Sequence, residues 1–263
     1  MYNQMKVIIR KQFFLCSIMF FSMFFLTSSF ANDLSKIKFI SEVYPPYNYE
    51  DAGSNKGIAI DLLIAAMGQQ GVSISGSDVK IQPWARGYRT ALKGPNMCLF
   101  ATTRTAERED KFKWVGPISK TRIVILSKIS NAIKIGSPTD LNNYTIGAIR
   151  DDVGEQLLKE LGIPSSSIKL GTDANAIVKK IQADRVQLWA YEENVGRWFI
   201  KNQGMDNSDY EVVHVLKEAE LYYAFSKDVS DETISALQSG IDSLNASTGA
   251  ATTAYQDIVN KYL

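Results

Sequence analysis

The chain has 263 residues, of which 45% are hydrophobic, 29 are Lys or Arg and 28 are Asp or Glu. This composition is that of an ordinary globular protein and excludes a disordered or fibrous chain. The formal net charge is +1, and no run of basic residues is longer than two. Nucleic acid and anionic membrane surfaces are therefore excluded as main partners, because both require clustered Lys and Arg.

The first 31 residues are predicted to be an export signal that is removed from the mature chain. Three basic residues precede residues 13–26, which are mainly apolar, and small side chains stand at Ser29 and Ala31. An uncleaved membrane anchor is the alternative, but this apolar stretch is shorter than the about 20 residues that a membrane-spanning helix needs. We therefore expect export and cleavage after Ala31.

The expected mature chain carries few residues with special chemistry. Cys98 is its only cysteine, so no intramolecular disulfide forms, and its apolar neighbours predict a position in the core. The single histidine, His214, alternates with valines as a strand residue does and has no local triad partner. Because no Cys/His spacing typical of a metal site occurs, we expect neither a metal nor another cofactor.

After the signal, short β-rich runs alternate with helical patterns, which is typical of an α/β protein with largely parallel sheets. Pro45 and Pro46 predict an irregular loop after the first strand, because proline withholds a donor and fixes the backbone. The expected elements of this first unit are strands 37–41, 79–82 and 97–102 and helices 58–70 and 86–92.

A second unit of the same kind follows residues 114–118. The mature chain is long enough for two lobes of about 100 residues each. The expected strands of the second unit are 121–126, 144–149, 168–170, 186–190 and 211–215, its expected helices are 154–161, 173–183 and 193–201, and two further helices, 234–244 and 252–262, end the chain.

Five segments carry a family resemblance: residues 39–47 (FISEVYPPY), 57–63 (GIAIDLL), 103–109 (TRTAERE), 114–117 (WVGP) and 146–149 (IGAI). In this order, behind an export signal, they resemble the polar amino-acid family of bacterial periplasmic solute-binding proteins, family 3. The resemblance covers essentially the whole mature chain. It implies the hinged, two-lobed α/β fold of type II periplasmic binding proteins, with a ligand cleft between the lobes.

The resemblance also implies how the chain is divided. Residues 32–119 and 226–263 would form lobe one, and residues 120–225 would form lobe two. By the same comparison, the chain crosses between the lobes near residues 119–124 and 222–227.

Several ligand contacts in lobe one follow from the resemblance. Arg108 matches the family's arginine that clamps the ligand's α-carboxylate, a task for which the two parallel donors of a guanidinium are suited. Thr103 matches a hydroxyl that donates to the same carboxylate, and Arg104 adds positive charge beside it. The alternative is that one of these arginines only pairs with Glu107 or Glu109 at the surface.

Acidic and aromatic residues complete this side of the implied cleft. Glu42 matches an acid that meets a cationic part of the ligand, and Tyr44 and Tyr47 match rings that cover its apolar part. Trp84 matches the other wall of the cleft, with interlobe or core packing as the alternative. Arg86 opens a helix, where the helix dipole disfavours a cation, so we expect an anionic partner for it.

In lobe two the match is weaker. The family usually has a Gly/Thr-rich turn that holds a carboxylate at a helix start, whereas this chain has Arg150-Asp151-Asp152. Two acids repel a carboxylate unless Arg150 offsets them, so we expect this lobe, with Arg150 and Asp152, to hold a cationic or amine group. Glu192 matches the acid that receives the ligand's α-amino group; an ordinary helix-start carboxylate is the alternative.

Together these features predict a periplasmic protein that closes around a small amine- and carboxylate-bearing solute and delivers it to an ABC-transporter permease. A sensor module for a membrane receptor would use the same cleft. The resemblance also includes a periplasmic dehydratase of prephenate-like acids, for which Glu42, Asp152 and Glu192 would supply a general acid. Without a nucleophile motif or metal spacing we expect no enzyme, and we expect a monomer.

Overall fold

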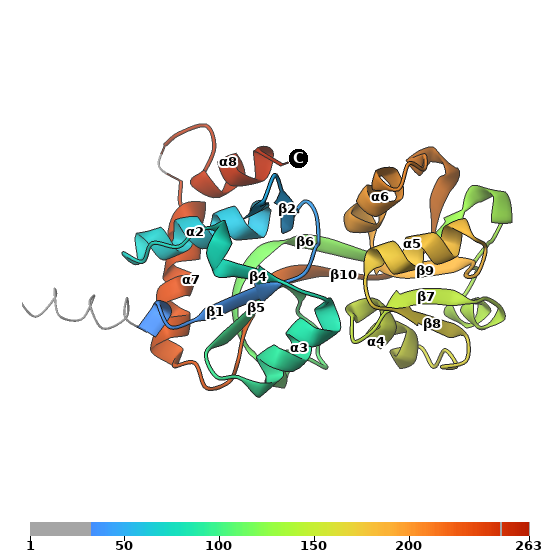
Figure 1. The fold of residues 1–263 in the computed structure, drawn as a ribbon, viewed down its shortest axis with the longest axis horizontal. Helices are drawn as coiled ribbons and strands as arrows, with labels where there is room; N and C mark the ends of the chain where they lie inside the picture. The colour runs from blue at the N-terminus through green and yellow to red at the C-terminus, as the bar shows by residue number, and fades with distance from the viewer. Residues whose placement is uncertain (1–32, 248, 263) are drawn as a thin grey trace, which may run out of the picture.

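The structure is a computed structural model that describes residues 33–247 and 249–262. The predicted export signal and its cleavage site lie outside the described residues. Figure 1 shows the described chain gathered into two lobes that are joined by a pair of long strands. The predicted mixed α/β class with parallel strand pairs is confirmed.

Lobe one contains elements from the beginning and the end of the described chain. Its strands β1, β4 and β5 are parallel, with Phe39 opposite both Val79 and Cys98. Gly240 lets two helices approach closely, because a Cβ atom there would lie 2.6 Å from the Ala66 carbonyl oxygen. The elements are β1 (Lys38–Ser41), β2 (Tyr49–Asp51), β3 (Ser54–Lys56), α2 (Ile58–Gln69), β4 (Val79–Ile81), α3 (Trp84–Lys93), β5 (Met97–Thr103), α7 (Asp231–Asn245) and α8 (Ala254–Asn260).

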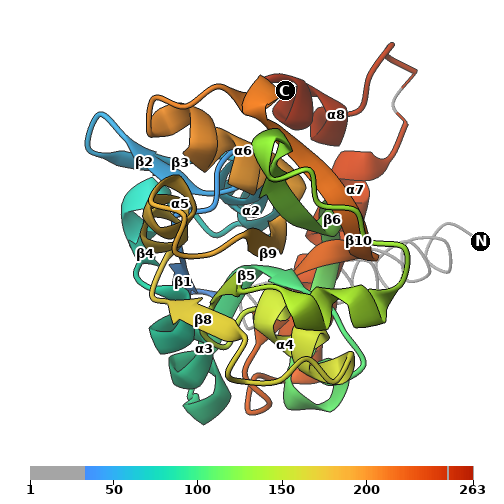
Figure 2. The same ribbon diagram turned by 90° about the vertical axis from the view of Figure 1, so that its right-hand side faces the viewer.

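Lobe two is a parallel unit of three strands and three helices. Helices α5 and α4 cover opposite faces of its sheet (Figure 2), because Gly147 faces Ile177 of α5 whereas Ala190 faces Gly154 of α4. The elements are β7 (Ile146–Ile149), α4 (Val153–Glu160), β8 (Ile168–Gly171), α5 (Ala174–Gln182), β9 (Leu188–Glu192) and α6 (Glu193–Asn202).

Strands β6 (Lys113–Lys128) and β10 (Tyr210–Phe225) pair in antiparallel fashion and run through both lobes. They complete, in the described chain, an eight-stranded sheet of order β4-β1-β5-β10-β6-β9-β7-β8. The division of the chain at residues 119/120 and 225/226 stays a prediction. The pairing of residues 221–225 with β5 favours a return to lobe one nearer residue 220.

The expected helices are present, with ends that agree to within three residues. Helix α3 begins at Trp84 rather than at Arg86, so Arg86 lies inside its first turn. The irregular loop at Pro45 and Pro46 is confirmed. The hairpin of β2 and β3 was not expected, because its strands are short and polar.

The structure also tests the positions predicted for Cys98 and His214. Cys98 is free and buried, and His214 lies on β10 opposite Ile125, so both expected positions are confirmed. The core includes apolar residues from both lobes, and each fully buried Leu or Ile in it stabilises the fold by about 1.5–3 kcal/mol. Within residues 33–247 and 249–262, no helix is long and apolar enough to cross a membrane.

Candidate ligand-binding site

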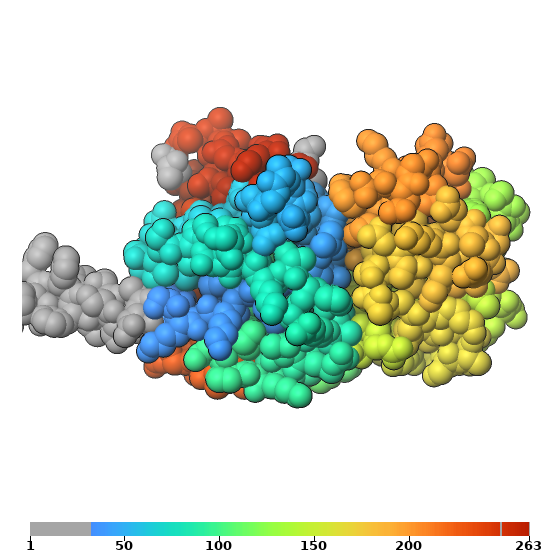
Figure 3. Space-filling model, viewed as in Figure 1, coloured from blue at the N-terminus to red at the C-terminus, as the bar shows by residue number. Residues whose placement is uncertain are grey.

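The carboxyl ends of parallel strands from the two lobes face the boundary between them. In sheets of this kind such ends are the usual place for a ligand. Glu42 follows β1, Thr103 ends β5, Asp152 follows β7 and Glu192 ends β9. The space-filling view shows the two lobes in contact along this boundary (Figure 3).

Arg108 is a buried cation at the boundary, with 2% of its surface exposed. Its guanidinium carbon lies 5.3 Å from the centre of the Trp84 ring and 5.2 Å from that of Tyr88. Its Nη1 and Nη2 atoms each donate to a carbonyl oxygen at 3.2 Å, that of Thr103 and that of Asp151. No Asp or Glu of the described chain forms an ion pair with it, so this guanidinium is suited to a carboxylate from outside the protein.

Arg104 has a different environment. Its guanidinium forms two hydrogen bonds with the Glu109 carboxylate, one of them at 2.8 Å, and lies over the Trp114 and Tyr222 rings. Arg104 is therefore the arginine that is paired at the surface, whereas Arg108 forms no ion pair with a described residue.

Three carboxyl groups are buried around the same boundary. Burial raises the pKa of Glu42 well above its ordinary value, and the nearby Asp152 raises it further, whereas Arg108 acts in the opposite direction. Burial also raises the pKa of Asp152, against the effect of Arg108. Glu192 is fully buried, and burial raises its pKa to about 7. The site therefore contains three acidic side chains around one basic side chain, that of Arg108.

Two of these carboxylates also cap helices. Glu192 accepts a hydrogen bond from the Val195 amide at 2.7 Å and caps α6, and Asp152 caps α4 through the Gly154 amide at 3.4 Å. Glu42 is different, because its carboxylate makes no hydrogen bond with any described residue. The helix-start role considered for Glu192 is thus present, and its second carboxylate oxygen accepts a longer hydrogen bond, of 3.4 Å, from the Asn194 side chain.

Aromatic rings line the boundary from both lobes. Tyr44 lies 5.7 Å from Tyr47 and 5.8 Å, edge to face, from Tyr191 of lobe two, and Tyr191 stacks on Trp189 at 4.9 Å. Burial raises the pKa of Tyr47 to about 12. The buried Tyr191 hydroxyl has no hydrogen-bond partner among the described residues. A buried hydroxyl without a partner costs about 1–3 kcal/mol, so a polar ligand is its natural partner.

Hydrogen bonds across the boundary hold the lobes together. The Asp151 carbonyl oxygen accepts from Trp84 Nε1 at 2.8 Å as well as from Arg108, and its carboxylate pairs with Arg89 at 3.0 Å. Gln156 donates to the Thr105 hydroxyl at 3.1 Å. A cavity of about 130 Å³ opens beside Arg108 and Asp152. The structure therefore shows the lobes closed on each other.

The family model of the bacterial extracellular solute-binding proteins, family 3, matches residues 37–263. The chain belongs to this family. Among solved structures, a histidine kinase sensor domain described as similar to periplasmic binding proteins shares the fold with a TM-score of 0.74 and 17% identity, over 86% of this chain and 96% of that one. A comparison with curated proteins found no match.

Amino-acid-binding proteins share the fold of this family-3 chain as well. A substrate-binding protein of an ABC uptake transporter from Streptococcus pneumoniae, solved with bound histidine, has a TM-score of 0.72 at 19% identity, over 88% of this chain and 94% of that one. An ancestral arginine-binding protein bound to arginine has a TM-score of 0.70 at 20% identity, over 86% and 97%. The implied type II periplasmic-binding-protein fold is thereby confirmed.

In this family-3 chain, the structure brings together eight of the expected contact residues and leaves three apart. Arg104 is paired with Glu109, and Arg150 is exposed, with no ion pair to Asp151 or Asp152. Arg86 is also exposed and points into a separate pocket. The residues that share the boundary are Glu42, Tyr44, Tyr47, Trp84, Thr103, Arg108, Asp152 and Glu192.

Asp151 and Tyr191 were missed by sequence reasoning. Asp151 acts mainly through its backbone carbonyl, which no residue pattern reveals, and has a φ of 60° in the left-handed region. Tyr191 directly precedes Glu192 at the end of a strand, and this position is a signal that could have found it.

Proposed function

We propose that this protein binds a small solute with a carboxylate and two cationic groups, of the kind that a basic amino acid presents, by closure of the two lobes around it. The observation that supports this most strongly is the charge of the boundary. One unpaired arginine, Arg108, lies among three buried carboxyl groups, those of Glu42, Asp152 and Glu192. Buried charges are stable only when they are paired.

The proposed arrangement assigns each charge a partner. The carboxylate of the solute lies against Arg108 and Thr103, as the family resemblance implies. Its α-amino group lies against Glu192, and its second cationic group meets Asp152 and Glu42. The surplus negative charge is removed by protonation of Glu42, whose raised pKa favours the neutral form. Tyr44, Tyr47 and Trp84 surround the apolar part of the solute.

We also propose that the mature protein acts in the periplasm and delivers its solute to an ABC-transporter permease. Membership of an extracellular solute-binding family supports this role. Proteins with the same fold carry arginine or histidine in solved structures, which supports a cationic ligand.

Native mass spectrometry of gently purified residues 32–263 tests the proposed function. We expect a small co-purifying mass that refolding removes, and a thermal shift when arginine, lysine or histidine is added back. The variant Arg104→Ala is the matched control, because Arg104 is paired with Glu109 and is expected to leave binding unchanged. No response to any amino acid would contradict the proposal.

A sensor module is the second candidate, favoured by the shared fold of the histidine kinase sensor domain. Uptake of the labelled ligand by cells with and without the gene separates the two roles. Lost uptake supports transport, and unchanged uptake with lost gene regulation supports sensing.

We propose binding without chemistry. Incubation of the purified protein with prephenate or arogenate, followed by absorbance, is expected to show no conversion. Conversion would establish an enzyme.

A further inference from the structure

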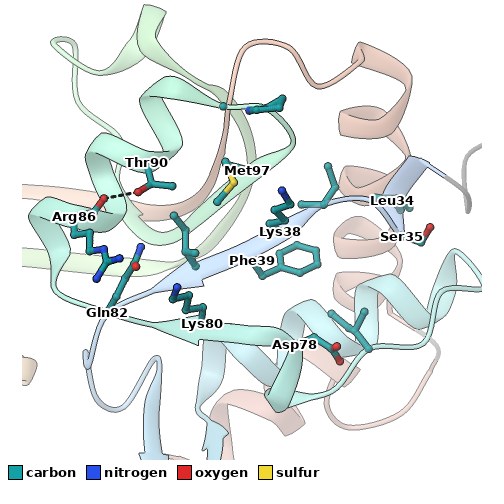
Figure 4. A pocket seen from close by; sticks show the side chains of 15 residues that line it. Leu34, Ser35, Lys38, Phe39, Asp78, Lys80, Gln82, Arg86, Thr90 and Met97 are labelled. Carbon is teal, nitrogen blue, oxygen red and sulfur yellow. Dashed lines mark hydrogen bonds between the residues drawn. The ribbon is translucent and has the colours of Figure 1, made fainter.

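Lobe one has a second concave site, away from the boundary between the lobes. It lies between α3 and the outer strands β1 and β4 and has a volume of about 590 Å³ (Figure 4). This volume is within the range of about 300–1,000 Å³ that is usual for small-molecule sites, which favours a small molecule over a protein surface. It shares no lining residue with the cavity beside Arg108.

Three cations surround this pocket. Lys38 and Lys80 lie on the same face of neighbouring strands, because Ile40, two residues after Lys38, is paired with Lys80. Arg86 reaches the pocket from the first turn of α3, and Figure 4 shows it on the same side as Lys38 and Lys80. All three are exposed, and none forms an ion pair with a described residue.

The pocket offers these three cations a single acid, Asp78. One oxygen of the Asp78 carboxylate accepts hydrogen bonds from the amide and hydroxyl of Ser75, at 2.8 and 3.0 Å, and Asp78 forms no ion pair with a described residue. Three like charges around one hollow repel each other unless an anion joins them. An anion bound here would be the anionic partner that the position of Arg86 predicts. It would lie in this pocket rather than in the cleft between the lobes.

The floor of the pocket is apolar. Ile40 and Met97 are buried and point to the same face of the sheet as Lys38, because Met97 is paired with Lys38. Gln82 adds an amide beside Arg86 in Figure 4. A ligand for this pocket therefore needs an apolar body as well as negative charge.

We propose that lobe one holds a second binding site, formed by Lys38, Lys80 and Arg86 over an apolar floor, for a small organic anion with at least two negative charges. A guanidinium and two ammonium groups are the usual partners of phosphate or paired carboxylate groups. The site is separate from the cleft, because its pocket shares no lining residue with the cavity beside Arg108.

Fluorescence titration with 1-naphthyl phosphate, which combines an aromatic body with a dianion, tests this site. We expect saturable binding that weakens as salt screens the charges. The triple variant Lys38→Gln/Lys80→Gln/Arg86→Gln is expected to bind about tenfold more weakly or worse, a change of about 1.4 kcal/mol or more. Inorganic phosphate and 1-naphthol, which each lack one half of the probe, are expected to bind more weakly.

Two controls locate the binding. Lys36→Gln removes a neighbouring exposed lysine that is paired with Asp33 and does not line the pocket, and it is expected to change nothing. Arg108→Ala changes a residue of the cleft that does not line this pocket, and it is also expected to leave probe affinity unchanged. The proposal is overturned if the wild-type protein does not bind the probe, if the triple variant binds it equally well, or if Arg108→Ala abolishes binding.

Discussion

The cleft between the lobes contains mainly acidic side chains that are buried. The pocket of lobe one that is lined by Lys38, Lys80 and Arg86, here called the outer pocket, contains mainly basic side chains that are exposed. In the cleft, Glu42, Asp152 and Glu192 are buried together, and burial raises the pKa of each. In the outer pocket, Lys38 and Lys80 are exposed, so water and salt screen their charge. Burial therefore decides how strongly a charge acts, and we expect single substitutions to have large effects in the cleft and small ones in the outer pocket.

The largest expected effect is that of Arg108→Ala. Its guanidinium is buried without an ion pair, and loss of one side of a buried pair with the ligand costs about 3–5 kcal/mol. We expect calorimetric affinity to fall by at least about a hundredfold. Arg108→Lys is expected to fail as well, because an ammonium cannot form the two parallel bonds. Unchanged affinity in either variant would remove Arg108 from the site.

The next largest expected effect is the pH dependence of stability that the Glu192 carboxyl group causes. Its folded-state pKa is about 7, above the ordinary value of 4.5, so the folded state binds more protons between these values and stability falls as pH rises through this window. The loss amounts to about 3 kcal/mol. Ligand affinity should rise over the same range, because the carboxylate form holds the amine.

Urea unfolding of the ligand-free protein at several pH values measures this effect. Glu192→Gln keeps an oxygen that can cap α6 and is expected to flatten the dependence. An equal slope in the variant and the wild type would show that another group titrates.

Glu42→Gln is expected to have a smaller effect of a different kind. The Glu42 carboxylate caps no helix and makes no hydrogen bond with a described residue, so its replacement by an amide relieves the cost of burial and should raise the thermal midpoint of the ligand-free protein. Affinity for a cationic ligand should change by less than about threefold, because Glu42 is neutral in the proposed complex and Gln is its neutral isostere. A variant that is less stable, or that binds the ligand much more weakly, would contradict the neutral form proposed for Glu42.

Trp84→Phe should have the smallest effect. It removes the Nε1 hydrogen bond to the Asp151 carbonyl but keeps a ring beside Arg108 and Tyr88. A hydrogen bond of this kind contributes about 0.5–1.5 kcal/mol, so we expect ligand to leave the variant a few times faster. Stopped-flow release measures this rate, and an unchanged rate would limit Trp84 to packing.

The sequence predicted the side chains that meet at strand ends better than the directions of those on helices. Glu42 follows β1 and Glu192 ends β9, and both are buried at the boundary between the lobes. On α3, Trp84 and Tyr88 are four residues apart and share the face toward Arg108, whereas Arg86 lies two residues from each and points to the opposite side. The sequence predicted a helix that begins at Arg86, whereas α3 begins at Trp84. The direction of the Arg86 side chain could not be predicted from the wrong helix start.

The long strands were harder to predict for another reason. Residues 217–220 are mainly polar, and Gly116 and Pro117 interrupt the pattern of β6, so only the ends that lie in lobe two were expected as strands. Their pairing with each other, at Ala219 opposite Thr121, stabilises the polar middle. Such pairing joins segments about a hundred residues apart, and no local pattern reports it.

The most direct test of the charge argument is calorimetric titration of the mature protein with arginine, citrulline and agmatine. Citrulline keeps the shape of arginine without the side-chain charge, and agmatine lacks the carboxylate. We predict that arginine binds at least about tenfold more tightly than either, because Arg108 needs the carboxylate and the buried acids need the cation. Equal binding of citrulline, or binding of glutamate in place of arginine, would contradict the account.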